Sequence, residues 1–170
     1  MNKIEYAEIY DKVYNLLCDH TPLIADCGIL CNHRCCRGDE RTGMLLFPGE
    51  TTTLDVITDN NQRLAVCDGS CKRINRPLSC MLFPFFPVID IKGKISVELD
   101  YRGTGICPLI LNADVTSFNK KFLRNVKKAG KILAKDNNIK QFMADVSEEI
   151  NEAKEFCLKM NEKRIEKYYG

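Results

Sequence analysis

Residues 26–41, with the sequence DCGILCNHRCCRGDER, decide how the rest of the chain is interpreted. This stretch carries four cysteines, two glycines and scattered charges, and its apolar residues follow neither a helical nor a strand period. A segment without an apolar face cannot gain order by packing one side against a core, so we predict a loop. Its order is expected to come from what its thiols hold.

The cysteines of this loop belong to a larger group. The chain has ten cysteines in 170 residues, and eight of them form one cluster in the sequence: Cys27, Cys31, Cys35, Cys36, Cys67, Cys71, Cys80 and Cys107. Short gaps allow neighbouring thiolates to converge on one centre, while distant cysteines tie separate loops to it, as four-coordinate metal sites require. The eight thiols therefore predict a metal centre. They could fill two four-cysteine sites, or one site with thiols to spare.

Three further details concern the choice of ligands. Cys35 and Cys36 are adjacent, and adjacent side chains diverge in most backbones, so the two either serve different metals or include one simply buried thiol. His33 lies in the same loop and is an alternative ligand. Cys18 and Cys157 end or line predicted helices and are expected to be buried or incidental rather than ligands.

The beginning of the chain bears on the compartment. Residues 1–17, MNKIEYAEIYDKVYNLL, have acidic residues among the apolar ones, unlike a secretion signal, and no apolar run approaches the ~20 residues of a membrane span. We therefore expect a cytoplasmic protein with no membrane partner. Clustered cysteines in a reducing compartment bind metal more often than they form disulfides. A disulfide-stabilised scaffold is the alternative for an oxidising compartment.

The segments around the cysteines predict an α+β fold in a single domain, 1–170. It comprises an N-terminal helix within 1–20, an irregular cysteine-rich metal-binding core over 21–110 and a helical hairpin over 114–168. Apolar residues at three- and four-residue spacing predict the first helix over 3–18. Short strands are expected at 44–47 and 63–67, and alternating residues on both sides of Lys92-Gly93 predict an antiparallel hairpin over 87–101.

Two amphipathic helices are expected at the C-terminal end. The first, over 116–135, has an apolar face that includes Val115 and Phe118 and a basic face on the other side. The second has a heptad seam from Ile139 to Met160 and is expected to pack along another helix. Its acidic residues either complement the basic helix or face solvent. Because the net charge is only +2, nucleic acid is not an expected partner, whereas an unknown protein partner is possible.

Residues 27–87 resemble the family of zinc- or iron-chelating domains named for a CxxCxxCC-type motif. Cys27, Cys31, Cys35 and Cys36 match its first half, and Cys67, Cys71, Arg76, Pro77, Cys80, Phe83 and Pro84 match its second. Two positions depart from the pattern: the early gaps are three residues long rather than two, and Met81 stands where the family commonly has arginine. Cys107 lies outside the motif. The resemblance implies metal binding, and some relatives are described as flagellin lysine methylases.

Two metals suit this cysteine set, because zinc and iron–sulfur clusters both take four thiolates. We favour an iron–sulfur cluster, of the 4Fe–4S type, over zinc. The first three cysteines are closely spaced and a later one lies next to proline and phenylalanine, which suits a cluster sheltered from water. Phe83, Phe85 and Phe86 are expected to cover the site. The predicted role is electron transfer, sensing or structural support. The alternative is a metal-dependent enzyme such as a protein lysine methyltransferase, although no glycine-rich loop for a nucleotide-like methyl donor is present.

Overall fold

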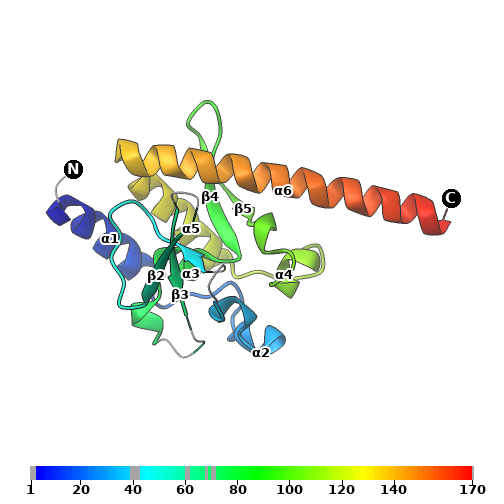
Figure 1. Cartoon of the computed structure of the whole chain (residues 1–170), viewed down its shortest axis with the longest axis horizontal. Coiled ribbons are helices and arrows are strands. Elements are labelled where there is room, and N and C mark those ends of the chain that lie inside the picture. Colours follow the sequence, from blue (N-terminus) through cyan, green and yellow to red (C-terminus); the bar gives the residue numbers. More distant parts are fainter. Residues whose placement is uncertain (1–2, 39–42, 60–61, 68, 70–71, 170) are drawn as a thin grey trace.

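The chain folds as an α+β protein, as predicted, with helices packed on two small antiparallel sheets (Figure 1). The computed structural model describes residues 3–38, 43–59, 62–67, 69 and 72–169. In chain order the elements are α1 (Lys3–Leu17), α2 (Gly28–Cys31), η1 (Arg34–Cys36), β1 (Met44–Leu45), β2 (Asp55–Asp59), β3 (Gln62–Val66), η2 (Arg73–Asn75), α3 (Leu78–Leu82), β4 (Phe85–Ile89), β5 (Ile95–Leu99), η3 (Tyr101–Gly103), α4 (Pro108–Leu111), α5 (Lys120–Leu133) and α6 (Asn137–Tyr169). Elements labelled η are 3₁₀ turns.

The hairpin of β4 and β5 is the centre of the main core. Its strands pair from Phe85 with Leu99 to Ile89 with Ile95, and the turn between them contains Gly93 with a positive φ of 76°. Successive side chains of a strand point to opposite faces. Accordingly, Phe85 packs edge-on against Phe118 and Phe122, next to α5, whereas Phe86 stacks on Phe47 on the other side. The hairpin was predicted, but β4 begins two residues earlier than expected.

Helix α5 begins later than its apolar pattern predicted. Asn119 caps the helix, because its side-chain oxygen accepts hydrogen bonds from the backbone N–H groups of Lys121 (3.0 Å) and Phe122 (3.3 Å). Val115, which was predicted to lie on the buried face, precedes the cap and is 79% exposed. Phe118 also precedes the cap and is half-buried. The other residues of that face, Phe122, Val126, Ala129 and Leu133, are buried as expected, and the helix packs on both strands of the hairpin and on α1.

Helix α6 contacts different elements from those its heptad seam predicted. Ile139, Met143, Val146 and Ile150 of the seam are fully buried. They belong to the main core, and α6 packs chiefly on β4 and η3 rather than along a partner helix. The expectation of a self-packed C-terminal helical hairpin was therefore wrong. The seam emerges from the core at Met160, which is 54% exposed, and the C-terminal end of α6 projects beyond the rest of the chain (Figure 1).

The second sheet has three strands in the order β1-β3-β2. Both predicted strands are present: β1 is shorter than the predicted 44–47, and β3 is shifted by one residue from the predicted 63–67. They pair with each other through Met44 opposite Ala65. The third strand, β2, was not predicted. Its sequence DVITD leaves four of five residues exposed, so it carries no alternation of buried and exposed residues for a pattern to detect.

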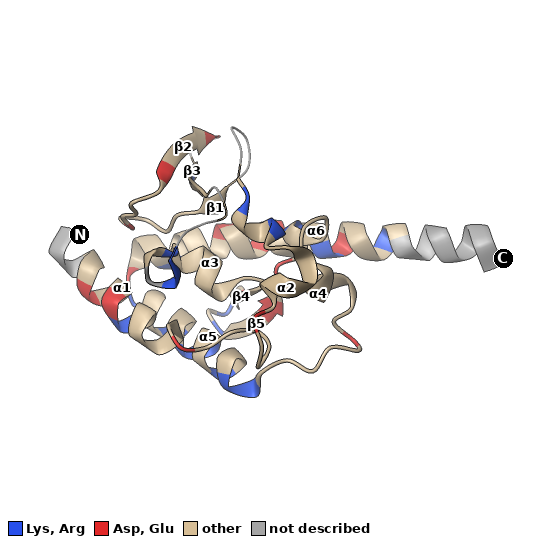
Figure 2. Cartoon of the chain, turned by 90° about the horizontal axis from the view of Figure 1, so that it is seen from below, with Lys and Arg blue, Asp and Glu red and all other residues tan. Residues whose placement is uncertain are grey.

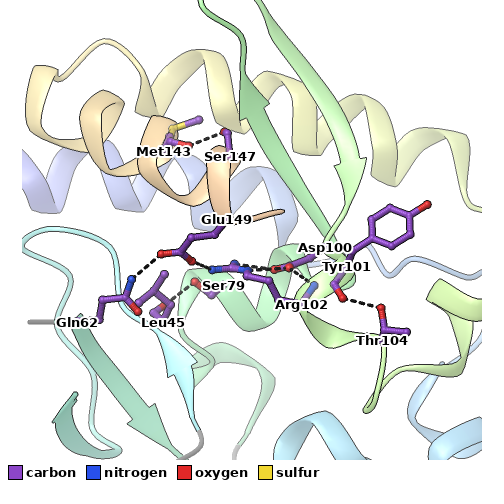
Figure 3. Close-up of polar contacts among 10 residues, drawn as sticks. All are labelled: Leu45, Gln62, Ser79, Asp100, Tyr101, Arg102, Thr104, Met143, Ser147 and Glu149. Carbon is purple, nitrogen blue, oxygen red and sulfur yellow. Dashed lines mark hydrogen bonds and ion pairs between the residues drawn. The ribbon is translucent and has the colours of Figure 1, made fainter. Parts of the chain in front are cut away.

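One polar network connects this second sheet to the hairpin and to α6 (Figure 3). Arg102 forms two hydrogen bonds with Asp100, of 2.9 and 2.8 Å, and a third of 2.6 Å with Glu149 of α6. The other carboxylate oxygen of Glu149 accepts a hydrogen bond of 2.9 Å from Gln62 of β3. The network thus joins segments that are 87 residues apart in the chain.

Among the described residues, no helix is both long enough and apolar enough to cross a bilayer.

Candidate metal centre

The cysteine loop is more regular than predicted. Between residues 26 and 38 it forms the single turn α2 and the 3₁₀ turn η1, so the expectation of an irregular loop was wrong here. Asn32 and His33 join the two turns with positive φ angles of 51° and 53°, which reverse the course of the backbone. Local hydrogen bonds fix the arrangement, from His33 N–H to the Gly28 carbonyl (2.9 Å) and from Cys36 N–H to the His33 carbonyl (2.8 Å).

This folding brings most of the predicted ligands to one place. A cavity of about 60 Å³ is lined by six of the eight candidate cysteines: Cys27, Cys31, Cys35, Cys36, Cys80 and Cys107. They come from the turns α2 and η1, from α3 and from the residue that precedes α4. Residues up to 80 positions apart in the chain therefore meet at a single cavity, which is what a shared metal centre requires.

Two structural features hold the walls of this cavity. Arg73 donates hydrogen bonds to the backbone carbonyls of Cys18 (2.6 Å) and His20 (2.5 Å), which fixes the segment after α1 against η2. On the other side, Cys107 is buried with Leu109 and Ile110 in a small apolar cluster that is separate from the main core, and Cys27 packs against this cluster. The cavity therefore lies beside the main core rather than inside it.

The thiols differ in their tendency to ionise. Burial, together with the nearby Cys107, Asp26 and Cys31, raises the pKa of Cys27 to about 11. Burial also raises the pKa of Cys107. Neutral thiols are favoured at these positions as long as no metal cation is bound, because a buried thiolate needs a compensating charge.

Cys35 and Cys36 behave as a pair. The Cys35 thiol donates a hydrogen bond to the sulfur of Cys36, which raises the pKa of Cys35 and lowers the pKa of Cys36. Arg76, which lines the cavity, and His33 further favour the Cys36 thiolate through their positive charge. Cys36 is thus more readily ionised than Cys35, and it does not behave as an inert apolar side chain.

The two remaining candidate ligands lie elsewhere. Cys67 is buried at the end of β3 and lines a neighbouring cavity together with Cys35. Its carbonyl accepts a hydrogen bond of 2.8 Å from Gly38 N–H, which holds the end of the cysteine loop close to β3. Cys71, the other member of this predicted pair, lies outside the described residues.

Several other residues differ from their predicted places. His33 is not among the residues that line the thiol cavity; the histidine that does line it is His20, which was not predicted. The sequence offers no signal for His20, because it reaches the cavity only through the docking of α1. Phe83 and Pro84 line the cavity as expected, but Phe85 and Phe86 pack in the main core. The predicted aromatic cover is therefore smaller than expected.

Cys18 and Cys157 lie apart from the cavity. Cys18 is exposed and its sulfur contacts the Asn15 carbonyl, whereas Cys157 is half-buried and its sulfur lies 3.6 Å from the hydroxyl of Thr104. Neither residue is among those that line the thiol cavity. Cys18 is thus exposed rather than buried, and the exclusion of both residues from the ligand set stays a prediction.

The thiols share a cavity without closing on one point. Among the described residues, no three side chains of His, Cys, Asp or Glu converge closely enough to hold a metal ion, and the nine described cysteines are all free thiols. Comparison with known proteins found no matching family model, no matching curated protein and no matching solved structure. The resemblance to the zinc- or iron-chelating domains accordingly remains a prediction.

Proposed function

We propose that this protein binds a metal centre through cysteine thiolates that line the cavity between α2, η1, α3 and α4. The observation that carries the proposal is the meeting of six cysteines from separate segments at one small cavity. Buried unpaired thiols are common, but they are usually dispersed as single apolar side chains. Cationic side chains, Arg73 and Arg76, also line the cavity and would offset part of the negative charge of bound thiolates.

Of the two metals, we favour an iron–sulfur cluster over zinc. Both need four thiolates, and in a 4Fe–4S cluster each thiolate binds a different iron. The apolar wall formed by Met81, Phe83 and Leu109 supports the cluster, because dry surroundings stabilise such clusters.

The proposed role is electron transfer, sensing or structural support, in a reducing compartment such as the cytoplasm, where thiolates remain available to metal. The lysine methyltransferase suggested by the resemblance remains the alternative. It would require a substrate site beside the metal centre.

The proposal is tested by anaerobic purification followed by analysis of iron, zinc and acid-labile sulfide and by a visible absorption spectrum. We expect iron and sulfide in equal amounts with a broad visible charge-transfer band. Stoichiometric zinc without sulfide would overturn the preference for a cluster. Protein purified under reducing conditions without either metal would overturn metal binding, and disulfides in that protein would support the scaffold alternative.

Cysteine variants identify the ligands. Cys31→Ser and Cys80→Ser are expected to lower the metal content, because both thiols line the cavity. Cys18→Ser and Cys157→Ser are matched controls outside the cavity and are expected to keep the metal content of the wild type. Loss of metal in Cys157→Ser alone would show that the centre lies elsewhere. Cys67→Ser tests whether the neighbouring cavity contributes a ligand. This variant should keep its metal if only the six-cysteine cavity binds metal.

A further inference from the structure

A second, larger cavity adjoins the thiol cavity, and we call it the outer cavity. Its volume is about 370 Å³, and the described residues that line it include Arg34, Cys35, Arg37, Met44, Cys67 and Phe83. Cys35, Met44 and Phe83 also line the thiol cavity, so these three side chains form the wall between the two. The outer cavity is about six times larger and lies within the usual size range of small-molecule sites.

Among the described residues that line the outer cavity, the charged side chains all have the same sign. Arg34 and Arg37 are both exposed, and no ion pair of either is found among the described residues. No acidic side chain belongs to the described part of the lining. Two guanidinium groups at one cavity repel each other and attract an oxyanion, which each can bind through two parallel N–H donors. A carboxylate or phosphate group is therefore the chemistry that fits this end of the cavity.

The rest of the lining is apolar. Met44, Ala65, Phe83 and Ile106 lie along it, and Ile106 is 41% exposed. A ligand with only an oxyanion would leave these side chains in contact with water. An anion attached to an aromatic or aliphatic body would cover them, and burial of apolar surface would add to the affinity.

We propose that the outer cavity binds a small organic anion, with its carboxylate or phosphate group on Arg34 and Arg37 and its apolar body against Phe83 and Ile106. That this ligand would lie beside a metal centre rests on the proposed function, because Cys35 lines both the outer cavity and the thiol cavity. Binding itself does not require the metal, because every residue named here belongs to the chain. The protein would thus bring a small molecule next to its thiol centre.

The test is calorimetric titration of the purified full-length chain with phenyl phosphate and with benzoate, which distinguish the two oxyanions. Inorganic phosphate is the probe for the anion alone, and benzyl alcohol is the probe for the apolar body alone. We expect one of the two aromatic anions to bind at least about tenfold more tightly than either single-feature probe, since one charge-assisted hydrogen bond accounts for about that factor. Equal binding of all four probes, or binding of none, would overturn the proposal.

The variant R34Q/R37Q should lower the affinity for the aromatic anion by about tenfold or more. The matched control is R124Q/K128Q, which removes two exposed cations from α5 and should leave binding unchanged. If both variants weaken anion binding equally, the effect is one of net charge, and the proposed site is overturned. Ile106→Glu is a second variant at the cavity rim that places a carboxylate near the anion, and it should also weaken binding.

Metal content measured on the same preparations separates the two proposals. Metal without anion binding would overturn this inference and leave the proposed function standing. Anion binding by protein that never contains metal would support this inference and overturn the proposed function.

Discussion

At the scale of single residues, Glu50 is a buried carboxylate that several parts of the chain hold in place. Its carboxylate is 1% exposed and accepts three hydrogen bonds, from the Tyr14 hydroxyl (2.7 Å) and from the backbone N–H groups of Phe47 (2.8 Å) and Leu78 (2.7 Å). These donors come from α1, from the segment after β1 and from α3. One buried acceptor therefore connects three parts of the chain, and its loss would leave buried donors without a partner.

We predict that Glu50→Ala lowers the free energy of unfolding by about 3 kcal/mol, because a buried donor without a partner costs about 1–3 kcal/mol. Urea denaturation followed by circular dichroism measures the change. Glu148→Ala is the matched control, since Glu148 is exposed on α6 and its substitution should change stability by no more than about 0.5 kcal/mol. Similar losses in the two variants would contradict the structural role of Glu50.

Glu50 also predicts a dependence of stability on pH. Burial is the largest influence on its pKa and raises it, and the three hydrogen bonds only partly oppose this effect. The native protein therefore holds the Glu50 proton more tightly than the unfolded chain, in which glutamate has a pKa of about 4.3. This contribution to stability is fully present below the unfolded value and is lost as the pH rises through the native value.

The corresponding measurement compares the wild type with Glu50→Gln in urea titrations between about pH 4 and about pH 7. The stability of the wild type relative to the variant should fall as the pH rises. A difference that is constant, or that grows with pH, would refute the raised pKa of Glu50.

The sequence predicted the candidate site unevenly at this scale. The spacing of the thiols correctly indicated that Cys27, Cys31, Cys35, Cys36, Cys80 and Cys107 lie together, because short gaps and loops restrict where their sulfurs can go. The sequence could not predict His20 in the lining. Its position depends on hydrogen bonds between the end of α1 and η2, which are more than 50 residues apart in the chain.

At the scale of elements, α5 has an unusual charge pattern. Its sequence KKFLRNVKKAGKIL has six cations and no acidic residue, and all six are exposed (Figure 2). None of the ion pairs among the described residues involves α5, so the acidic residues of α6 do not neutralise it. Arg124, Lys127 and Lys131 follow one another at three- and four-residue spacing, at which like charges destabilise a helix.

We therefore predict that Lys127→Glu raises the free energy of unfolding by about 0.5–1 kcal/mol, because it replaces repulsion from Arg124 and Lys131 with attraction. Lys127→Gln removes the repulsion without adding attraction and should give about half of the gain. Thermal unfolding at low and high salt measures both variants, and the gain should shrink at high salt because screening weakens the pairs. A gain that is independent of salt would point to helix propensity instead.

The elements themselves were predictable where one face is buried and the other is exposed. This holds for α1, α5 and the β4–β5 hairpin, whose apolar residues recur at the period of the element. The pattern fails for β2, which is exposed on both faces, and for α2 and η1, which depend on a few local hydrogen bonds. For α6 the heptad seam correctly identified the buried face but could not identify the strand that covers it.

At the scale of the whole molecule, the two apolar clusters divide the chain into parts with different dependence on the thiols. The main core contains the hairpin, α1, α3, α5 and the first half of α6, and none of the candidate cysteines that the structure describes belongs to its buried residues. Cys107 and Cys27 instead belong to the small cluster with Leu109 and Ile110. A cluster with so few buried side chains contributes little stability of its own.

This separation has a consequence under the proposed function. The main core could then fold before a metal is bound, so that folding and metal loading would be separate steps. In hydrogen exchange followed by mass spectrometry, metal-free protein should keep slow exchange in β4 and α5 while residues 27–36 and 107–111 exchange rapidly. Loading should slow only the second group. Uniform loss of protection on metal removal would show instead that the metal holds the entire fold together.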